Sequence, residues 1–432
     1  MTQSRWFRLS MCAVCALLSL LWAVRIGINA VGGATGFRGV YFGTKCLMHG
    51  RDPYREPQLI DFYKSEGQTL PVAVPSREAL TLYVNLPTTF LAVAPFAAMP
   101  WRIALPLWFL STAGVFFVAV VLILERSATA ASAPSLFLIC LLLLNCEVLF
   151  ATCNTAGIVV GLCVIAVDCF LKNRWTKIGV VCLGISLAIK PHDVGLVWLF
   201  FMLGGGINRI RALKSLLVTA TLAVTALIWV SFVAPHWLPE LRANLHQINA
   251  SGGLNEPGPS SMTGQTPAMV IDLQAAISIF HDQPDFYNIA TYMICGALLL
   301  IWCVRTCTMK SLDSNAWLAL AAVVPLTLLF TYHRPYDAKI LLLAIPACTT
   351  LWAQGNIRGR VAFLFTALGI GLTGDVPLAI LVELFKRLKF SGSSIQDKML
   401  ALALTRPASV ALFFAAIFYL WTYTRESGKV KG

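Results

Sequence analysis

Long apolar runs separated by short polar connections dominate the chain. These runs cover residues 9–31, 84–100, 103–124, 134–150, 155–171, 178–190, 193–206, 214–234, 288–304, 315–332, 338–353, 360–382 and 405–424. An α-helix needs about 20 apolar residues to cross the hydrocarbon core of a bilayer. The pattern therefore predicts an all-α polytopic membrane bundle of about twelve transmembrane helices, formed as one integral membrane domain over residues 1–432.

Several of these runs are too short for an ordinary crossing. The runs 84–100 and 134–150 fall below about 20 residues, and so do the two runs that flank Lys190. We interpret the flanking pair as abutting helices that meet at Lys190-Pro191. One run between residues 84 and 171 is predicted to be re-entrant, because the positions of the basic loops require an odd number of crossings there. Such breaks are expected to line a cavity.

Composition and charge agree with this picture. The chain is 58% hydrophobic and 12% charged, whereas a soluble domain carries about 25% charged residues. The net charge of +13 comes from short basic clusters between apolar runs. A nucleic-acid-binding surface would need a basic patch instead, so no nucleic-acid partner is expected. The charge excess is typical of the positive-inside rule.

Counting the basic clusters gives an orientation. Both termini are predicted to be cytoplasmic in a multi-pass protein of the plasma membrane, with segments 32–83, 235–287 and 333–337 on the outer face. The run 9–31 is read as an uncleaved first span, because no small-residue cleavage site follows it. Segment 383–400 is basic but falls outside, so we expect an amphipathic surface segment there.

One outer stretch, 249–267, is rich in Gly, Pro and Ser. It is predicted to be a mobile loop that either closes over a substrate or simply connects two helices.

Polar groups among apolar runs are costly and suggest function. In "HGRDPY" the Asp-Pro-Tyr sequence is typical of a turn. The alternative is that Asp52 acts as a base that deprotonates an acceptor hydroxyl. In "YHRPYDAK", Arg334 is suited to bind a phosphate and His333 to donate to the same leaving group. The alternative there is a solvated hairpin in which Arg334 pairs with Asp337.

The sequence "IKPHDVG" places Lys190, His192 and Asp193 beside a helix-breaking proline. It is either a hairpin tip whose lysine reaches the interface, or a discontinuous helix that faces an anionic ligand. Asn154 is expected to cap the helix that starts near Thr155.

Three further carboxylates lie in or beside apolar runs. Glu147 must be neutral, paired or next to water. Asp168 is expected to pair at a basic helix end, and Asp375 to face the interior of the bundle.

Metal and cofactor chemistry lack a sequence signal. Most of the thirteen cysteines lie in apolar runs, without a CxxC pair or a Cys/His spacing that suits zinc. Neither a phosphate-binding loop, a dinucleotide fingerprint, a Ser-His-Asp set nor a two-metal carboxylate cluster is evident. We therefore expect no metal site and no cofactor.

Several motifs in order resemble glycosyltransferase family 87, which has the GT-C fold. They are "FRGVYFGTKCLMHGRDPY", "LYVNLPTTFLAVAPFAAMPWRIALPLW", "CNTAGIVVGLCVIA", "GVVCLGISLAIKPHDVGL" and "YHRPYDAKILLLAIP". The resemblance implies a polyprenyl-phosphate sugar donor, commonly of mannose, and a lipid or glycan acceptor at the outer face, with membrane lipids as surroundings. It also implies a metal-independent inverting transfer that uses a carboxylate of the first outer segment.

The chain departs from this family at Gly36, where an acidic residue is usual. Either Asp52 or Asp61 replaces that acid, or the chain binds glycan without turnover. "CNTAG" also differs from the usual Gly-Gln-x-Asn sequence. A transporter or flippase is the other alternative. The predicted catalytic residues are Asp52 and His333; the predicted substrate-binding residues are Tyr54, Asn154, Lys190, His192, Arg334 and Asp337.

Overall fold

The computed structural model describes residues 33–72, 74–250, 252–259, 270–308, 315–374 and 394–426, together with 377, 380, 381, 383 and 384. Every regular element among these residues is a helix, which confirms the predicted all-α class. The predicted first span, 9–31, and Asp375 lie outside the described residues.

Four of the helices are long and apolar enough to cross a membrane. They are α6 (Trp101–Leu144), α11 (Gly206–Val233), α15 (Pro284–Cys307) and α21 (Pro407–Glu426). Large apolar side chains on α11 and α15, such as Phe232 and Met293, are exposed, as expected of a surface that contacts lipid. These helices indicate a membrane protein, but they do not confirm about twelve crossings, because every other described helix has 17 residues or fewer.

Helix α6 joins two runs that the hydrophobic pattern had separated. Its backbone is non-helical at Ala131, three residues before Pro134. A proline inside a helix removes a backbone hydrogen bond and produces such a kink. The run 134–150 therefore consists of the last part of α6 and the short helix α7 (Glu147–Ala151).

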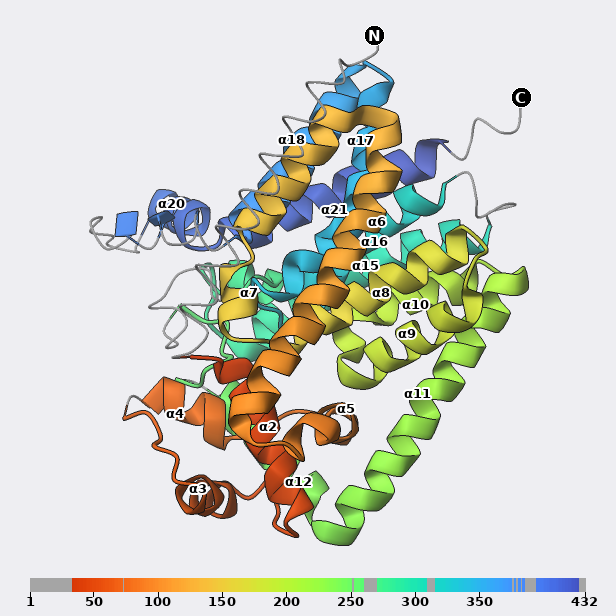
Figure 1. Cartoon of the computed structure of the whole chain (residues 1–432). Helices are drawn as coiled ribbons and strands as arrows, with labels where there is room; N and C mark the ends of the chain where they lie inside the picture. Colours follow the sequence, from red (N-terminus) through yellow and green to blue (C-terminus); the bar gives the residue numbers. More distant parts are fainter. Residues whose placement is uncertain are drawn as a thin grey trace.

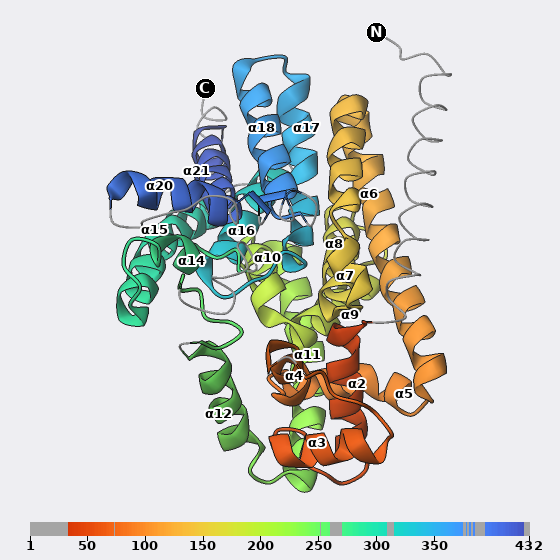
Figure 2. The same cartoon turned by 90° about the vertical axis from the view of Figure 1, so that its left-hand side faces the viewer.

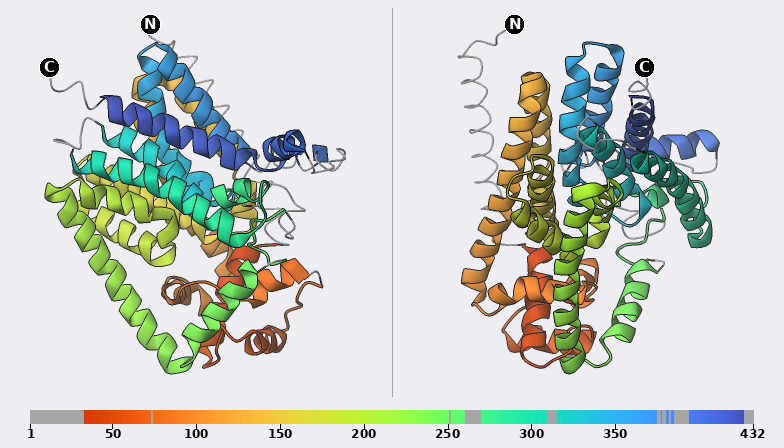
Figure 3. Two further views of the ribbon diagram at one scale, coloured as in Figure 1. Left: turned by 180° about the vertical axis from the view of Figure 1, so that it is seen from behind. Right: turned by 90° about the vertical axis from the view of Figure 1, so that its right-hand side faces the viewer.

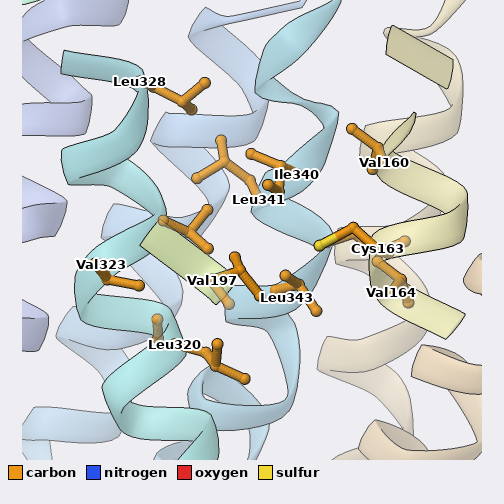
Figure 4. Packing of buried hydrophobic residues seen from close by; sticks show 14 of the residues in the cluster. Val160, Cys163, Val164, Val197, Leu320, Val323, Leu328, Ile340, Leu341 and Leu343 are labelled. Atoms are coloured by element: carbon orange, nitrogen blue, oxygen red, sulfur yellow. The ribbon is translucent and has the colours of Figure 1, made fainter. Parts of the chain in front are cut away.

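The centre of the bundle is built from shorter helices. They are α8 (Thr155–Leu171), α9 (Thr176–Ile189), α10 (Pro191–Leu203), α16 (Ala316–Phe330), the 3-10 helix η1 (Asp337–Ala344), α17 (Ile345–Ala353) and α18 (Ile357–Leu372). Their apolar side chains form one core. Figure 4 shows Ile340 and Leu343 of η1 between Val164 of α8 and Leu320 of α16. The helix α8 has the bounds that its apolar run predicted.

The two long segments that are expected on the outer face contain helices. Segment 32–83 holds α2 (Thr35–Met48), α3 (Glu56–Ser65) and α4 (Val74–Thr81), followed by α5 (Pro87–Ala97). The rings of Trp101 and Trp108 stack on Phe37 with centroids 5.5 and 4.8 Å away. Aromatic packing of this kind stabilises α2 although the segment has no long apolar run.

The second outer segment contributes α12 (Trp237–Asn249) and α14 (Leu273–Ile277), and α20 (Ile395–Thr405) precedes α21. Figures 1 and 2 show α2 to α5 and α12 gathered at one end of the molecule, and we call these five helices the terminal lobe. Helix α11 runs obliquely from the bundle to this lobe (Figure 3).

The ends of the central helices differ in chemistry. Lys172 and Arg174 follow α8, and Arg209 lies in the first turn of α11, just after α10, whereas Asn154 and Lys190 lie at the opposite ends of the central helices. The hydroxyl of Thr88 in α5 donates to the carbonyl of Ala188, so the Lys190 end faces the terminal lobe. By the positive-inside rule the lobe is expected on the outer side.

Candidate functional site

Two helix breaks bring the polar side chains of the bundle together. Lys190 has an extended backbone (φ −140°, ψ 80°) between α9 and α10, and Pro191 is the first residue of α10. A proline at this position fits the helix start, where its missing N–H group is not needed. The second break, residues 331–336, separates α16 from η1. The predicted pair of abutting helices that meet at Lys190-Pro191 is therefore present.

An ion pair joins the two breaks. The ammonium Nζ of Lys190 lies 2.5 Å from Oδ1 of Asp337 and 3.6 Å from Oδ2 of Asp193. The other oxygen of Asp337 accepts the backbone N–H of Arg334 at 2.9 Å. Both carboxylates are buried. One lysine thus compensates two buried carboxylates, which makes its charge essential to the arrangement.

The imidazole of His333 is fully buried between these charges. Its Nδ1 lies 2.7 Å from the carbonyl oxygen of Thr331, and its Nε2 lies 3.5 Å from Oδ1 of Asp193. Because a carbonyl only accepts, Nδ1 must carry a proton. Nε2 then faces a carboxylate oxygen, a favourable arrangement only when it is protonated too. Burial by itself lowers the pKa of His333, but Asp193 outweighs this effect, and the pKa lies above its ordinary value.

The carboxylate of Asp193 has a second imidazole beside it. Nε2 of His192 lies 3.2 Å from the oxygen that faces His333, and the two rings are 5.2 Å apart between centroids. The side chain of His192 is 41% exposed, so it connects the buried group to the surroundings. Asp193 was not among the predicted site residues. Its spacing of three residues from Lys190 in the first turn of a helix is the signal that points to it.

The guanidinium of Arg334 holds a loop. It donates to the carbonyl of Leu254 at 3.1 Å, to Oδ1 of Asn255 at 3.3 Å and to the hydroxyl of Tyr332. Pairing with Asp337 occurs through the backbone of Arg334, not through this guanidinium. The described part of the predicted mobile loop, residues 252–259, is thus attached to the site.

A metal ion is one possible occupant of this arrangement. Ligand atoms of His192, Asp193 and His333 lie within 4.8 Å of one another, and they form the only such group among the residues that the structure describes. A nitrogen-rich set suits a transition metal. However, the Lys190 ammonium already supplies a positive charge to Asp193, so the arrangement suits proton transfer and anion binding better.

Asp52 and Tyr54 belong to a different set of contacts, in the terminal lobe. Oδ1 of Asp52 accepts the backbone N–H of Tyr54 at 2.9 Å, which is the geometry of an Asx turn. Oδ2 lies 3.9 Å from Nε of Arg55, and burial raises the pKa of Asp52 above its ordinary value. The hydroxyl of Tyr54 donates to the carbonyl of Asn85. These are the contacts of a loop corner. The other acid proposed for this segment, Asp61, is exposed.

Asn154 and Gly36 meet where the lobe joins the bundle. The side chain of Asn154 accepts the N–H of Ala156 at 2.9 Å and so caps α8, as expected. A Cβ atom on Gly36 would lie 2.9 Å from the carbonyl oxygen of Thr152 and 3.2 Å from Nδ2 of Asn154. An acidic side chain at position 36 therefore requires a displacement of one of these segments.

Asp168 and Glu147, two further carboxylates noted in the sequence, have local explanations. Asp168 pairs with Lys172 at 3.0 Å near the basic end of α8, as expected. Glu147 begins the short helix α7 and is only partly buried, so its negative charge lies near the positive end of a helix dipole.

Comparison with known proteins gives one match. The model of glycosyltransferase family 87 matches residues 83–331. This range contains Lys190, His192 and Asp193 and ends two residues before His333. No curated protein and no solved structure matches the chain.

Proposed function

The chain belongs to glycosyltransferase family 87, and we propose that it transfers a hexose, such as mannose, from a polyprenyl-phosphate sugar to a lipid or glycan acceptor. The reaction would take place on the outer face of the plasma membrane, with both termini in the cytoplasm. The observation that carries the proposal is the buried ion cluster of Lys190, Asp193, His333 and Asp337 at two helix breaks. Intramembrane charges of this kind mark substrate sites.

The length of the surrounding helices supports a lipid-linked substrate. Helix α9 has 14 residues, so it is about 21 Å long, whereas the hydrocarbon core of a bilayer is about 30 Å thick. A cluster at the end of such a helix lies below the membrane surface. A phosphate carried on a lipid chain can reach this depth from within its leaflet, because its hydrophobic part remains in the membrane.

In the proposed reaction an acceptor hydroxyl attacks the anomeric carbon of the donor sugar. A new glycosidic C–O bond forms, the bond between this carbon and the phosphate oxygen breaks, and the hydroxyl proton passes to a carboxylate. Lys190, His192 and Arg334 would bind the phosphate, with His333 as the proton donor to it and Asp337 orienting Lys190. Asp52 remains the predicted base, and Tyr54 and Asn154 remain predicted contacts of the substrate. The mechanism needs no metal.

Membranes that contain the protein test this function directly. Supplied with radiolabelled polyprenyl-phosphate mannose and a membrane glycolipid extract, they are expected to form a labelled glycolipid, whereas the Asp52→Asn variant is expected to lose about 10²- to 10⁴-fold in rate. The exposed Asp61 supplies the matched control, Asp61→Asn, which should retain the activity. Absence of label with the natural chain contradicts the function; full activity of Asp52→Asn contradicts only the choice of base.

The Asp193→Asn variant should change the pH dependence of transfer. A protonated His333 is present below its folded-state pKa and is lost as the pH rises through it. Asp193 raises that pKa, because its negative charge favours the protonated imidazole. Without this charge, the alkaline fall of the rate is expected at a lower pH. Rate profiles between pH 5 and 9 measure it, with Asp193→Glu as the variant that should restore the natural profile. An unchanged alkaline limb would contradict this role.

Binding without turnover is the second candidate, favoured by the close packing at Gly36. Retention of a labelled donor by the purified protein, without product, would identify this function.

A further inference from the structure

Another buried cation lies at the start of α21, apart from the cluster around Lys190. Arg406 is 2% exposed, and its Nη2 donates to the carbonyl of Pro257 at 3.3 Å. Its Nε and Nη1 have no hydrogen-bond partner among the described residues, and no ion pair within 4.0 Å joins it to an acid there. A buried guanidinium with two nitrogens that have no acceptor is strongly unfavourable. This side chain is therefore suited to a ligand that supplies acceptors and a negative charge.

Further unused donors lie within one turn of Arg406. Ser409 is fully buried, and its hydroxyl has no partner in the described part of the chain. Helix α21 starts at Pro407, which has no N–H group, so the N–H groups of Ala408 and Ser409 are those of its first turn that have no acceptor within the helix. The positive end of the helix dipole adds to the guanidinium charge. Guanidinium, hydroxyl and helix N-terminus together are the donors that bind phosphate in proteins.

The nearest acid does not neutralise Arg406 by direct contact. Asp272 caps α14, and its Oδ1 accepts the N–H of Ala275 at 2.8 Å, while its buried Oδ2 is unpaired within the described residues. Burial raises the pKa of Asp272 to about 6. This acid is therefore easily protonated when an anion arrives, and its O–H group then becomes a further donor.

These residues lie close to the ion cluster that contains His333. Helix α21 contacts α14, α16 and α20, which lie in the same region of Figure 2. The N–H of Ile271 donates to the carbonyl of His333 at 3.0 Å, so Asp272 directly follows a residue that contacts the cluster. Segment 252–259 is bound by Arg334 at Leu254 and by Arg406 at Pro257. The two arginines thus donate to carbonyl groups that are three residues apart in one segment.

Lys190 and Arg334 differ from Arg406, because their charged groups already have protein partners. Lys190 lies against two carboxylates, and Arg334 donates to three acceptors. A negative ligand gains more from a cation whose hydrogen bonds are unused, because no existing pair has to be broken.

We propose that Arg406, Ser409 and the first turn of α21 form a binding site for a phosphate ester carried on a lipid chain. The inference extends the proposed function, since such an ester is present in a polyprenyl-phosphate donor and equally in a phospholipid-type acceptor. Binding itself does not depend on turnover. Arg406 donates to the carbonyl of Pro257 in the structure, so a phosphate that binds Nη2 would replace this contact.

The purified full-length chain in detergent tests the site by thermal unfolding with polyprenyl phosphate, with phosphatidic acid or with inorganic phosphate. For the natural chain, at least one lipid phosphate is expected to raise the unfolding temperature. In Arg406→Met the affinity for that lipid should fall at least about tenfold, which corresponds to the loss of about 1.4 kcal/mol. Ser409→Ala should weaken binding less. Arg425→Met removes an exposed cation from the other end of the same helix and should leave binding unchanged.

The unfolding temperature without ligand distinguishes a ligand-binding role of Arg406 from a purely structural one. If Arg406 is a ligand-binding cation, Arg406→Met should be as stable as the natural chain or more stable, because the substitution removes a buried guanidinium with two unpaired nitrogens. A stabilisation by polyprenyl phosphate alone identifies a second site for the donor lipid, apart from Lys190, and an equal response to phosphatidic acid identifies a general site for lipid phosphates. The proposal is overturned if neither lipid stabilises the natural chain, or if Arg406→Met responds to lipid as the natural chain does. Absence of transfer with binding intact would contradict only the proposed function.

Discussion

Replacing His333 by glutamine is expected to lower the rate of sugar transfer by about 100-fold or more, because general acid–base groups contribute about 10²–10⁴. The buried ring holds a proton between Thr331 and Asp193 and is placed to donate it as charge develops on the leaving phosphate. Glutamine retains a hydrogen-bond donor of similar size but cannot carry the positive charge. Initial rates at saturating donor measure the effect.

A matched substitution separates this effect from general damage. His246 is an exposed histidine of α12, and His246→Gln should leave the rate within about twofold, since exposed substitutions change little. The unfolding temperatures of both variants should be compared with that of the natural chain. If folded His333→Gln retains more than a tenth of the natural rate, His333 is not the proton donor.

Replacing Lys190 by methionine is expected to reduce the free energy of unfolding by about 3–5 kcal/mol, the usual effect of removing one partner of a buried ion pair. The variant leaves Asp337 and Asp193 without the cation that lies 2.5 and 3.6 Å away. Unfolding of the purified protein in a denaturing detergent series gives the difference in stability.

Two further variants sharpen this test. The double variant Lys190→Met with Asp337→Asn should regain part of the stability, because it removes one of the uncompensated charges. Lys172, whose side chain is 37% exposed and pairs with Asp168, supplies the comparison: Lys172→Met should cost only about 0–1 kcal/mol. A Lys190→Met variant as stable as Lys172→Met would show that the buried pair contributes little.

The helices of the bundle were predictable because lipid-facing and core helices share one signal, a long apolar run. The run 155–171 coincides with α8. Segment 32–83 lacked this signal, and its helices depend on contacts such as the stacking of Phe37 on Trp108. These contacts join residues far apart in the sequence, so periodicity alone does not reveal them. The kink at Ala131 was hidden for the same reason, because both halves of α6 are apolar.

The candidate site was predictable where a charge interrupts an apolar run. Lys190, His192, His333, Arg334 and Asp337 were identified in this way, and contacts across the two helix breaks bring them together. The sequence does not show which of these side chains contact one another.

Two residues show this limit clearly. Asp193 was noticed beside the proline, but its importance depends on His333, which is 140 residues away. Arg406 is an ordinary basic residue near a helix start until its burial is known. Asp52 is the opposite case: a conspicuous acid whose neighbours, Tyr54 and Arg55, are local.

The shortness of α9 has a mechanical consequence for the surrounding bilayer. Its outward side chains, including Ile178 and Val181, are exposed, so lipids must match a helix about 21 Å long. Hydrophobic mismatch of this size is relieved by local thinning of the bilayer, at a cost that rises with its thickness. The membrane beside α9 would then be drawn down toward Lys190, which shortens the path of a polar head group to the site. Bilayer thickness thereby becomes a control on how readily a lipid substrate is engaged.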